Sequence, residues 1–183
     1  MDRRSLSAGF TLIELLVVVA VMAILQSLAA PPLAVMVNSM RLTMAVNSFF
    51  SSLMLARSEA IKRNGRAVVC KSISGETCIT TGGWEQGWIV FHDVNNNGRR
   101  DVGEALLLQQ QALPASIRLS GNSPVANYVS YTSLGVTSYT SGAFQAGTLT
   151  ICNESATSGD ARQIVISSAG RPRSVKTLVA QCS

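Results

Sequence analysis

The feature that most constrains this chain is an apolar run near its start, from Phe10 to Ala30, which follows a basic head containing Arg3 and Arg4. As an α-helix the run would be about 30 Å long, enough to cross the hydrocarbon core of a bilayer. Arginines before such a helix favour a cytoplasmic N-terminus. The run is longer than a signal-peptide core, and SLAAPP is only a weak cleavage site. The sequence therefore predicts a single-pass membrane helix at 10–30.

A carboxylate, Glu14, lies inside this apolar run. Inserting a charged residue in the middle of a membrane helix costs about 2.5–3.5 kcal/mol of free energy, so the carboxylate of Glu14 needs a partner. Together with Glu14, the stretch SAGFTLIELLVVVAVMAIL resembles the N-terminal signature of type IV pilins and type II secretion pseudopilins. The resemblance implies that a prepilin peptidase removes a leader, residues 1–9, by cutting after Gly9. It also implies that Phe10 is N-methylated and that Glu14 pairs with the N-terminal amine of a neighbouring subunit during assembly.

A helical pattern continues beyond the apolar run, and we expect residues 31–64 to form an amphipathic continuation of the same helix. Its apolar positions are spaced by threes and fours: Leu42, Val46, Phe49, Leu53, Ala56 and Ala60. The pair Asn64-Gly65 is a typical helix stop. The stripe predicts a helix face packed on its own domain.

From residue 65 to residue 183 the sequence predicts a β-rich globular domain. Short β-branched or alternating runs, broken by Gly, Asn, Ser and Pro, mark eight strands: RAVVCK, GWIVFH, EALLLQQ, SIRLS, NYVSYT, GTLTICN, RQIVIS and SVKTLVA. The Ser/Thr/Gly-rich stretch 132–148 predicts an exposed loop or an irregular hairpin. One long helix followed by strands indicates an α+β fold, with the helix packed on an antiparallel sheet.

Three further stretches, ARSEAIKRN, GGWEQGWIVFHDVNNNGRRDVGEALL and SSAGRPR, resemble the GspH/FimT group of minor pilins and pseudopilins. The resemblance implies the type IV pilin fold. It also implies a minor type IV pilin held in the inner membrane, with a cytoplasmic N-terminus and a periplasmic C-terminal domain. Its partners would be the prepilin peptidase, other major and minor pilins and the inner membrane, before it enters the pilus or its tip complex. The alternative is the H-type minor pseudopilin of a type II secretion system, and the sequence leaves both open.

The segment Gly170-Arg171-Pro172-Arg173 matches a Gly-Arg-x-Arg element that, in FimT-like members of this group, is associated with DNA uptake. The resemblance therefore makes Arg171, Arg173 and Lys176 candidate DNA-binding residues. They would neutralise about three phosphates and give weak, salt-sensitive binding. A solvated loop end is the alternative. Other basic residues extend the patch if the fold brings them close: Arg57, Lys62, Arg63, Arg66, Arg99 and Arg100.

An even number of cysteines in an exported chain predicts two disulfides. Three connectivities are possible for Cys70, Cys78, Cys152 and Cys182. Spacing favours Cys70–Cys78, which closes a short loop, together with Cys152–Cys182, which ties down the C-terminal tail. The single histidine, His92, completes no Cys/His zinc set of familiar spacing.

The stretch DVNNNGRRDVGE fits the calcium-loop template at five ligand positions, namely Asp93, Asn95, Asn97, Asp101 and Glu104. Its flanks are strand-like rather than helical, and two arginines lie within it. A β-hairpin with a left-handed Asn/Gly tip is therefore favoured over a calcium site. We expect no metal and no cofactor.

No phosphate loop or catalytic triad motif is present, and no acid or nucleophile accompanies the histidine in a familiar spacing. We expect a protein that is not an enzyme.

Overall fold

The structure, a computed structural model, describes residues 10–154 and 159–182, with the side chains of residues 27–32, 34 and 35 left undescribed. The expected leader, residues 1–9 with Gly9, lies outside the described residues. The chain divides after Ser39 into two compact units. The second unit contains the end of the long helix and all the strands.

A single helix, α1, runs from Leu12 to Lys62. It ends as the sequence predicts, because Asn64 adopts a left-handed conformation (φ 49°) and the Gly65 amide donates a 3.1 Å hydrogen bond to the Ala60 carbonyl. Among the described residues, no helix is long and apolar enough to cross a membrane. The span expected at 10–30 stays a prediction.

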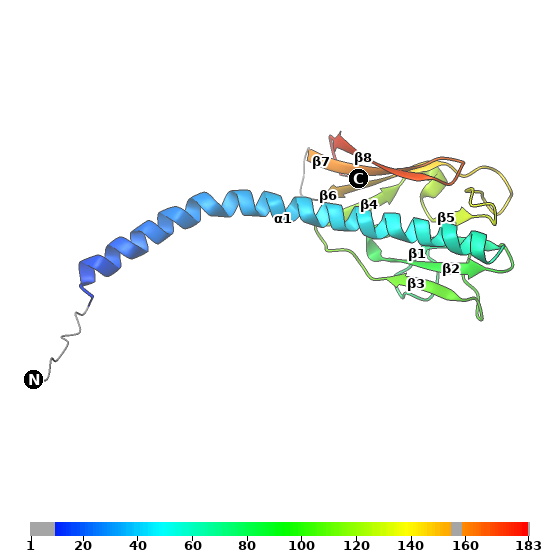
Figure 1. The fold of residues 1–183 in the computed structure, drawn as a ribbon, viewed down its shortest axis with the longest axis horizontal. Helices are drawn as coiled ribbons and strands as arrows, with labels where there is room; N and C mark the ends of the chain where they lie inside the picture. Colours follow the sequence, from blue (N-terminus) through cyan, green and yellow to red (C-terminus); the bar gives the residue numbers. More distant parts are fainter. Residues whose placement is uncertain (1–9, 155–158, 183) are drawn as a thin grey trace, which may run out of the picture. The chain divides into compact units, whose positions relative to one another are not determined.

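Eight strands form two four-stranded antiparallel sheets (Figure 1). The first sheet has the order β3 (Leu106–Gln110), β2 (Trp88–Asp93), β1 (Arg66–Lys71) and β5 (Tyr128–Tyr131). The second has the order β4 (Ile117–Gly121), β6 (Gly147–Asn153), β7 (Gly159–Ile166) and β8 (Pro172–Val179). Two short 3-10 turns, η1 (Trp84–Gln86) and η2 (Ser123–Val125), join strands. The expected α+β class is confirmed, although the strands divide into two sheets instead of one.

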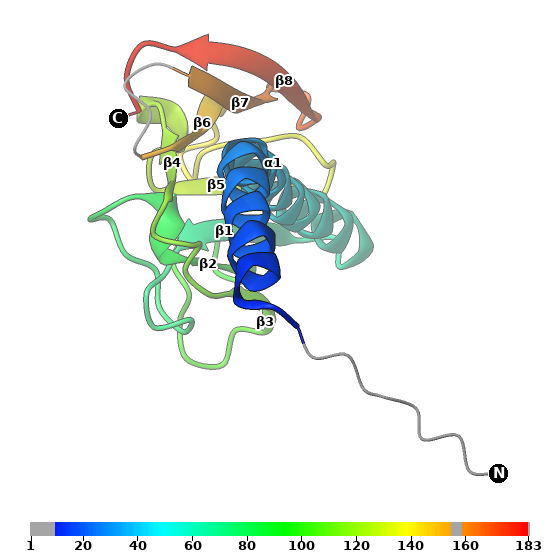
Figure 2. The same ribbon diagram turned by 90° about the vertical axis from the view of Figure 1, so that its left-hand side faces the viewer.

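The predicted apolar stripe of α1 forms the centre of the core. All six predicted residues are buried, and strands of both sheets contribute to the same cluster. Phe49 makes edge contacts with both tryptophans, at centroid distances of 5.0 Å to Trp84 and 5.0 Å to Trp88. Because this stripe supplies the core, the end of α1 belongs to the same unit as the sheets (Figure 2).

A second, smaller apolar cluster lies on the face of the first sheet that is turned away from α1. Since alternate residues of a strand point to opposite faces, Ala67 and Val69 pack in the main core, whereas Val68 and Cys70 pack in this cluster. The loop after β1 is closed by the Cys70–Cys78 disulfide. The second disulfide joins Cys152 to Cys182, so the favoured pairing is the one the structure contains.

The calcium-like stretch forms the connection of the β2–β3 hairpin, as favoured from the sequence. Its buried carboxylates accept hydrogen bonds from the backbone of the loop. Asp93 accepts from Asn97 and Gly98, at 3.1 and 2.9 Å. Glu104 accepts from Val94 and Asp101, at 2.8 and 3.0 Å. These side chains shape the loop from within.

Candidate nucleic-acid interface and assembly segment

The candidate basic segment begins at the tight turn between β7 and β8. The Gly170 amide donates a 2.8 Å hydrogen bond to the Ser167 carbonyl, and Gly170 has a φ of 73°, a region that favours glycine. A Cβ atom at this position would overlap the carbonyl oxygen of Gly135 and lie 3.0 Å from Cα of Val136. Gly170 is therefore required by both its conformation and its neighbour.

The turn at Gly135, which packs against Gly170, is fixed by a hydrogen bond from α1. Arg57 of α1 donates a 2.9 Å hydrogen bond from Nε to the Gly135 carbonyl. The backbone amide of Thr137 donates a 3.3 Å hydrogen bond to the Ser168 carbonyl, and its buried hydroxyl lies between the carbonyls of Gln145, at 2.6 Å, and Ser167, at 3.0 Å. The helix, the loop and the β7–β8 turn thus form one braced support for the start of β8.

Arg171 and Arg173 are exposed, two residues apart on this support. Alternate residues of an extended chain share a face, so the two arginines point to the same side of the sheet. Arg173 is opposite Val165 in the ladder, whereas Lys176 is opposite Arg162. Lys176 therefore points to the other side, and the structure does not bring the three predicted residues onto one face.

The two arginine side chains are available to a ligand. Neither makes a hydrogen bond or ion pair with another residue in 10–154 or 159–182. β8 is an edge strand of its sheet, so its outer side faces no further strand of the described chain. A pocket of about 510 Å³ lies beside it, lined by Val165, Ser167, Arg171, Pro172 and Arg173.

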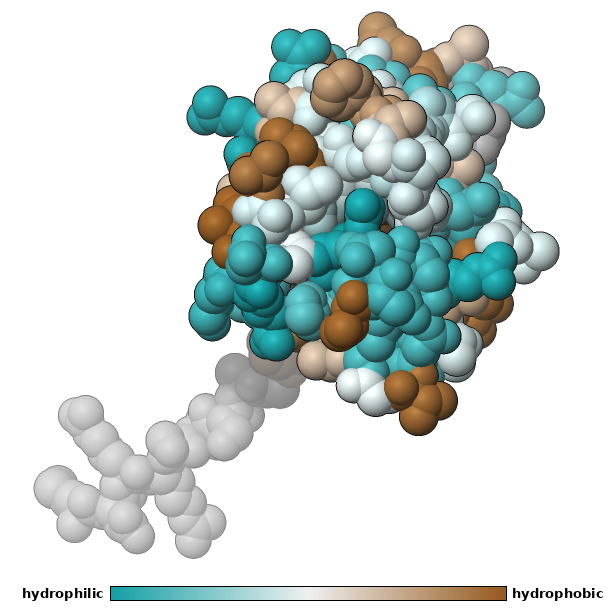
Figure 3. Space-filling model, turned by 90° about the vertical axis from the view of Figure 1, so that its right-hand side faces the viewer, coloured by the Kyte–Doolittle hydropathy of each residue, from teal (hydrophilic) through white to brown (hydrophobic). Residues whose placement is uncertain are grey.

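Most of the other basic residues are held by local partners. Lys62 and Arg63 form ion pairs with Glu59 at 3.5 and 2.6 Å. Arg66 donates to Asn96, Ser130 and the Ser138 carbonyl, and Arg100 donates to the Glu76 carbonyl. Arg57 donates a hydrogen bond to the Gly135 carbonyl, and Gly135 packs against the turn that carries the candidate arginines. The face shown in Figure 3 is mainly hydrophilic, with separate small hydrophobic patches.

The start of α1, the candidate assembly segment, exposes apolar side chains on all sides. Phe10, Leu12 and Ile13 are 83%, 76% and 70% exposed, and the large apolar residues after them as far as Leu25 are also exposed. The backbone amide of Glu14 donates a 3.4 Å hydrogen bond to the Thr11 hydroxyl. This Thr-x-x-Glu spacing is a helix-capping signal that can be found in the sequence.

The middle of the chain, residues 45–170, matches the family model for type II transport protein GspH. The chain belongs to the GspH family. Residues 4–29 also match the prokaryotic N-terminal methylation motif. The GspH match ends at Gly170, so Arg171, Arg173 and Lys176 lie beyond it.

Solved structures of pilins share the fold. The type IV minor pilin FimU of Pseudomonas aeruginosa aligns over 78% of this chain and 100% of its own, with 19% identity and a TM-score of 0.56. The minor pseudopilin EpsH of the Vibrio cholerae type II secretion system aligns over 76% and 97%, with 12% identity and a TM-score of 0.52. The expected type IV pilin fold is confirmed.

A curated relative is the pilin-like protein PilA1 of Thermus thermophilus, which is 36% identical over 96 residues. The match covers 52% of this chain and 54% of PilA1, so the chain spans about half the length of that relative. Among the described residues, no group of three or more His, Cys, Asp or Glu side chains is arranged to hold a metal.

Proposed function

We propose that this protein is a minor type IV pilin that is anchored in the inner membrane by residues 10–30, cleaved after Gly9 by a prepilin peptidase and methylated at Phe10. The observation that carries the proposal is the start of α1, where apolar side chains are exposed all round the helix. A helix that is apolar on every side is stable only in a membrane or among other subunits. The match to the methylation motif supports the same processing.

Glu14→Val is expected to leave leader cleavage intact and to lower incorporation into filaments by about tenfold or more, because the N-terminal amine of the neighbouring subunit loses its carboxylate partner. The cap at Thr11 survives, since its donor is the backbone amide of residue 14. Immunoblots of membranes and of sheared filaments measure cleavage and incorporation separately. Leu15→Val is the control for a change of side chain in the same turn. Normal incorporation of the Glu14 variant would contradict the pairing.

We further propose that Arg171 and Arg173 bind the phosphates of DNA during natural transformation. Two unpaired guanidinium groups, one just before an edge strand and one within it, support this, since each can form two parallel hydrogen bonds to one phosphate. The braced turn before them limits the freedom that they lose on binding. Lys176 contributes less in this proposal, because it points to the other face of β8.

The full-length chain in non-ionic detergent should bind short duplex DNA at about 50 mM salt and much more weakly at about 200 mM. The double variant Arg171→Ala/Arg173→Ala should lose two phosphate contacts and reduce the slope of log K against log salt by about 1.8. Fluorescence anisotropy of labelled DNA measures both quantities. Arg41→Ala, which removes an exposed arginine of α1, is the control for net charge. Equal binding by the double variant would exclude the two arginines as the contact.

The alternative filament is the pseudopilus of a type II secretion system, which the likeness to EpsH supports as strongly as the likeness to FimU supports a pilus. Measuring transformation and protein secretion after deletion of the gene distinguishes the pilus from the pseudopilus. Loss of pilus-dependent transformation with normal protein secretion assigns the chain to a type IV pilus. Loss of secretion with normal transformation assigns it to a pseudopilus.

A further inference from the structure

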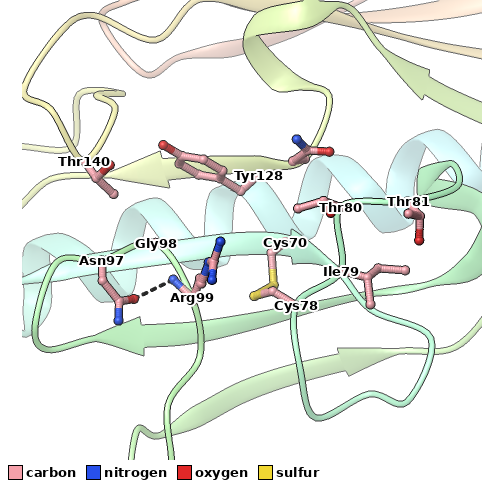
Figure 4. A pocket seen from close by; sticks show the side chains of 11 residues that line it. Cys70, Cys78, Ile79, Thr80, Thr81, Asn97, Gly98, Arg99, Tyr128 and Thr140 are labelled. Carbon is pink, nitrogen blue, oxygen red and sulfur yellow. Dashed lines mark hydrogen bonds between the residues drawn. A yellow bond between two sulfur atoms is a disulfide. The ribbon is translucent and has the colours of Figure 1, made fainter.

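A pocket of about 550 Å³ lies on the face of the first sheet that is turned away from α1, in the size range of small-molecule sites. Its floor contains the Cys70–Cys78 disulfide and Ile79. Its walls come from the disulfide loop, from the β2–β3 connection and from the region of β5. Figure 4 shows Asn97 and Arg99 on one side of it and Tyr128 on another, with the Tyr128 hydroxyl directed toward Thr140.

The pocket brings together polar side chains whose hydrogen-bonding capacity is unused. Each lines the pocket, and none has a side-chain hydrogen bond or ion pair with another residue of the described chain: Thr80, Thr81, Arg99, Asn127, Tyr128 and Thr140. Five of the six are neutral groups, and all five can both donate and accept. The sixth, Arg99, is a donor with a fixed positive charge.

A glycine keeps the pocket open between two of its walls. Gly98 has a φ of 76°, and a Cβ atom there would lie 3.0 Å from the Thr140 methyl and 3.7 Å from the ring of Tyr128. The two oxygens of Asp93 hold the backbone amides of Asn97 and Gly98. The wall formed by Asn97 and Gly98 is therefore fixed before any ligand arrives.

The same loop fixes the backbone of Arg99 and leaves its guanidinium free. The Arg99 amide donates a 2.7 Å hydrogen bond to the side-chain oxygen of Asn97. Asp101, a carboxylate of the same loop, accepts 2.7 Å hydrogen bonds from the side-chain amides of Asn95 and Asn97. These amides are the chief reason that the pKa of Asp101 is lowered, and the charge of Arg99 is a smaller cause. Within the part of the chain that the structure describes, Arg99 thus remains an unpaired cation of this pocket.

We propose that this pocket binds a sugar that carries a carboxylate, such as a hexuronic or sialic acid unit of a surface polysaccharide. Sugar hydroxyls donate and accept, which matches the neutral amide and hydroxyl side chains on the walls. The ring of Tyr128 offers an apolar face to the C–H groups of a sugar ring. Arg99 selects the acidic sugar, because a guanidinium and a carboxylate form paired, charge-assisted hydrogen bonds.

Fatty or aromatic ligands fit the pocket less well, because sites for drug-like molecules are lined mainly by apolar side chains. Here polar groups surround a small apolar floor. The carbohydrate site is independent of the proposed filament role and of the candidate DNA contact, since it uses other residues on the other sheet.

Binding is tested with the full-length chain in a detergent that has no sugar headgroup. Saturation-transfer NMR and titration should give saturable binding of glucuronate or N-acetylneuraminate and much weaker binding of glucose. Arg99→Gln should weaken binding of the preferred acid about tenfold or more and leave glucose unchanged. Tyr128→Leu should weaken binding of acid and neutral sugars alike.

Arg41→Gln makes the same chemical change on α1 and should leave sugar binding unchanged. Arg99 makes no side-chain hydrogen bond or ion pair with the described residues, so its variant should keep the wild-type melting temperature, which circular dichroism checks. Equal affinity for glucose and the acids would overturn the proposal, as would failure of both acids to bind. Displacement of the acids by an equal concentration of inorganic phosphate or of DNA would also overturn it, because the pocket would then be a general anion site.

Discussion

Replacing Phe49 by alanine is expected to lower the free energy of unfolding of the globular unit by about 3–5 kcal/mol. Phe49 is completely buried, and its ring makes edge contacts with Trp84 and Trp88. The cavity left by the ring cannot collapse easily, because the indole nitrogens of both tryptophans are fixed. Trp84 donates to the Val125 carbonyl at 3.0 Å and Trp88 to the Ser52 hydroxyl at 2.9 Å. The free energy of unfolding of most domains is only about 5–15 kcal/mol, so this loss would be a large part of it.

The change can be measured by denaturant unfolding followed by tryptophan fluorescence. The chain contains two tryptophans, and both contact Phe49, so the signal reports on this part of the core. Met54→Ala is the control, because it also shortens a large apolar residue of α1, but one that is 41% exposed. A Phe49 variant no less stable than the Met54 variant would show that this ring is not central to the core.

The parts of the fold set by local spacing could be predicted from the sequence. The stripe from Leu42 to Ala60 follows the helical period, and every one of its predicted residues is buried. The strands Arg66–Lys71 and Gly147–Asn153 begin and end where their runs of β-branched residues do. The short disulfide loop follows from spacing as well, since Cys70 and Cys78 are only eight residues apart.

The division into two sheets could not be predicted, because strand pairing depends on contacts between residues far apart in the chain. Strand β5 joins β1, whereas its sequence neighbour β4 joins β6. The Ser/Thr/Gly-rich stretch 132–148 shows the same limit. It is irregular, as expected, yet polar residues within it are buried. Thr137 holds the β7–β8 turn, and Gln145 donates to the carbonyls of Pro124 and Tyr128.

The candidate site was predicted in part. Sequence pattern and resemblance made Arg171, Arg173 and Lys176 candidates, but they did not predict on which face of the sheet each side chain would lie. In β8, paired with β7, successive side chains point to opposite faces of the sheet, so Lys176 and Arg173 lie on different faces. No local signal relates Arg57 or Gly135 to the arginines, because their contacts depend on the packing of a helix and a loop from distant parts of the chain.

Gly170→Ala is expected to destabilise the domain and also to weaken DNA binding, although it removes no charge. The positive φ costs an L-residue about 1–2 kcal/mol. The added methyl would overlap the Gly135 carbonyl, and relief of that overlap by backbone shifts costs about 1–3 kcal/mol more. Because Gly135 is held by Arg57, the strand rather than the loop should move. The start of β8 and its two arginines would then lose their fixed position.

Gly142→Ala separates the cost of the positive φ from the cost of the overlap with Gly135. Gly142 also has a positive φ, 87°, but a methyl group added there would have no atom of the described chain within 4 Å. It should show the conformational cost alone and leave DNA affinity unchanged. Thermal unfolding and DNA anisotropy of both variants give the comparison. If both glycine variants lose the same stability and bind DNA like the wild type, the contact between Gly170 and Gly135 does not position the arginines. If only Gly170→Ala weakens binding, the glycine of Gly-Arg-x-Arg is a positioning residue for the arginines that follow it.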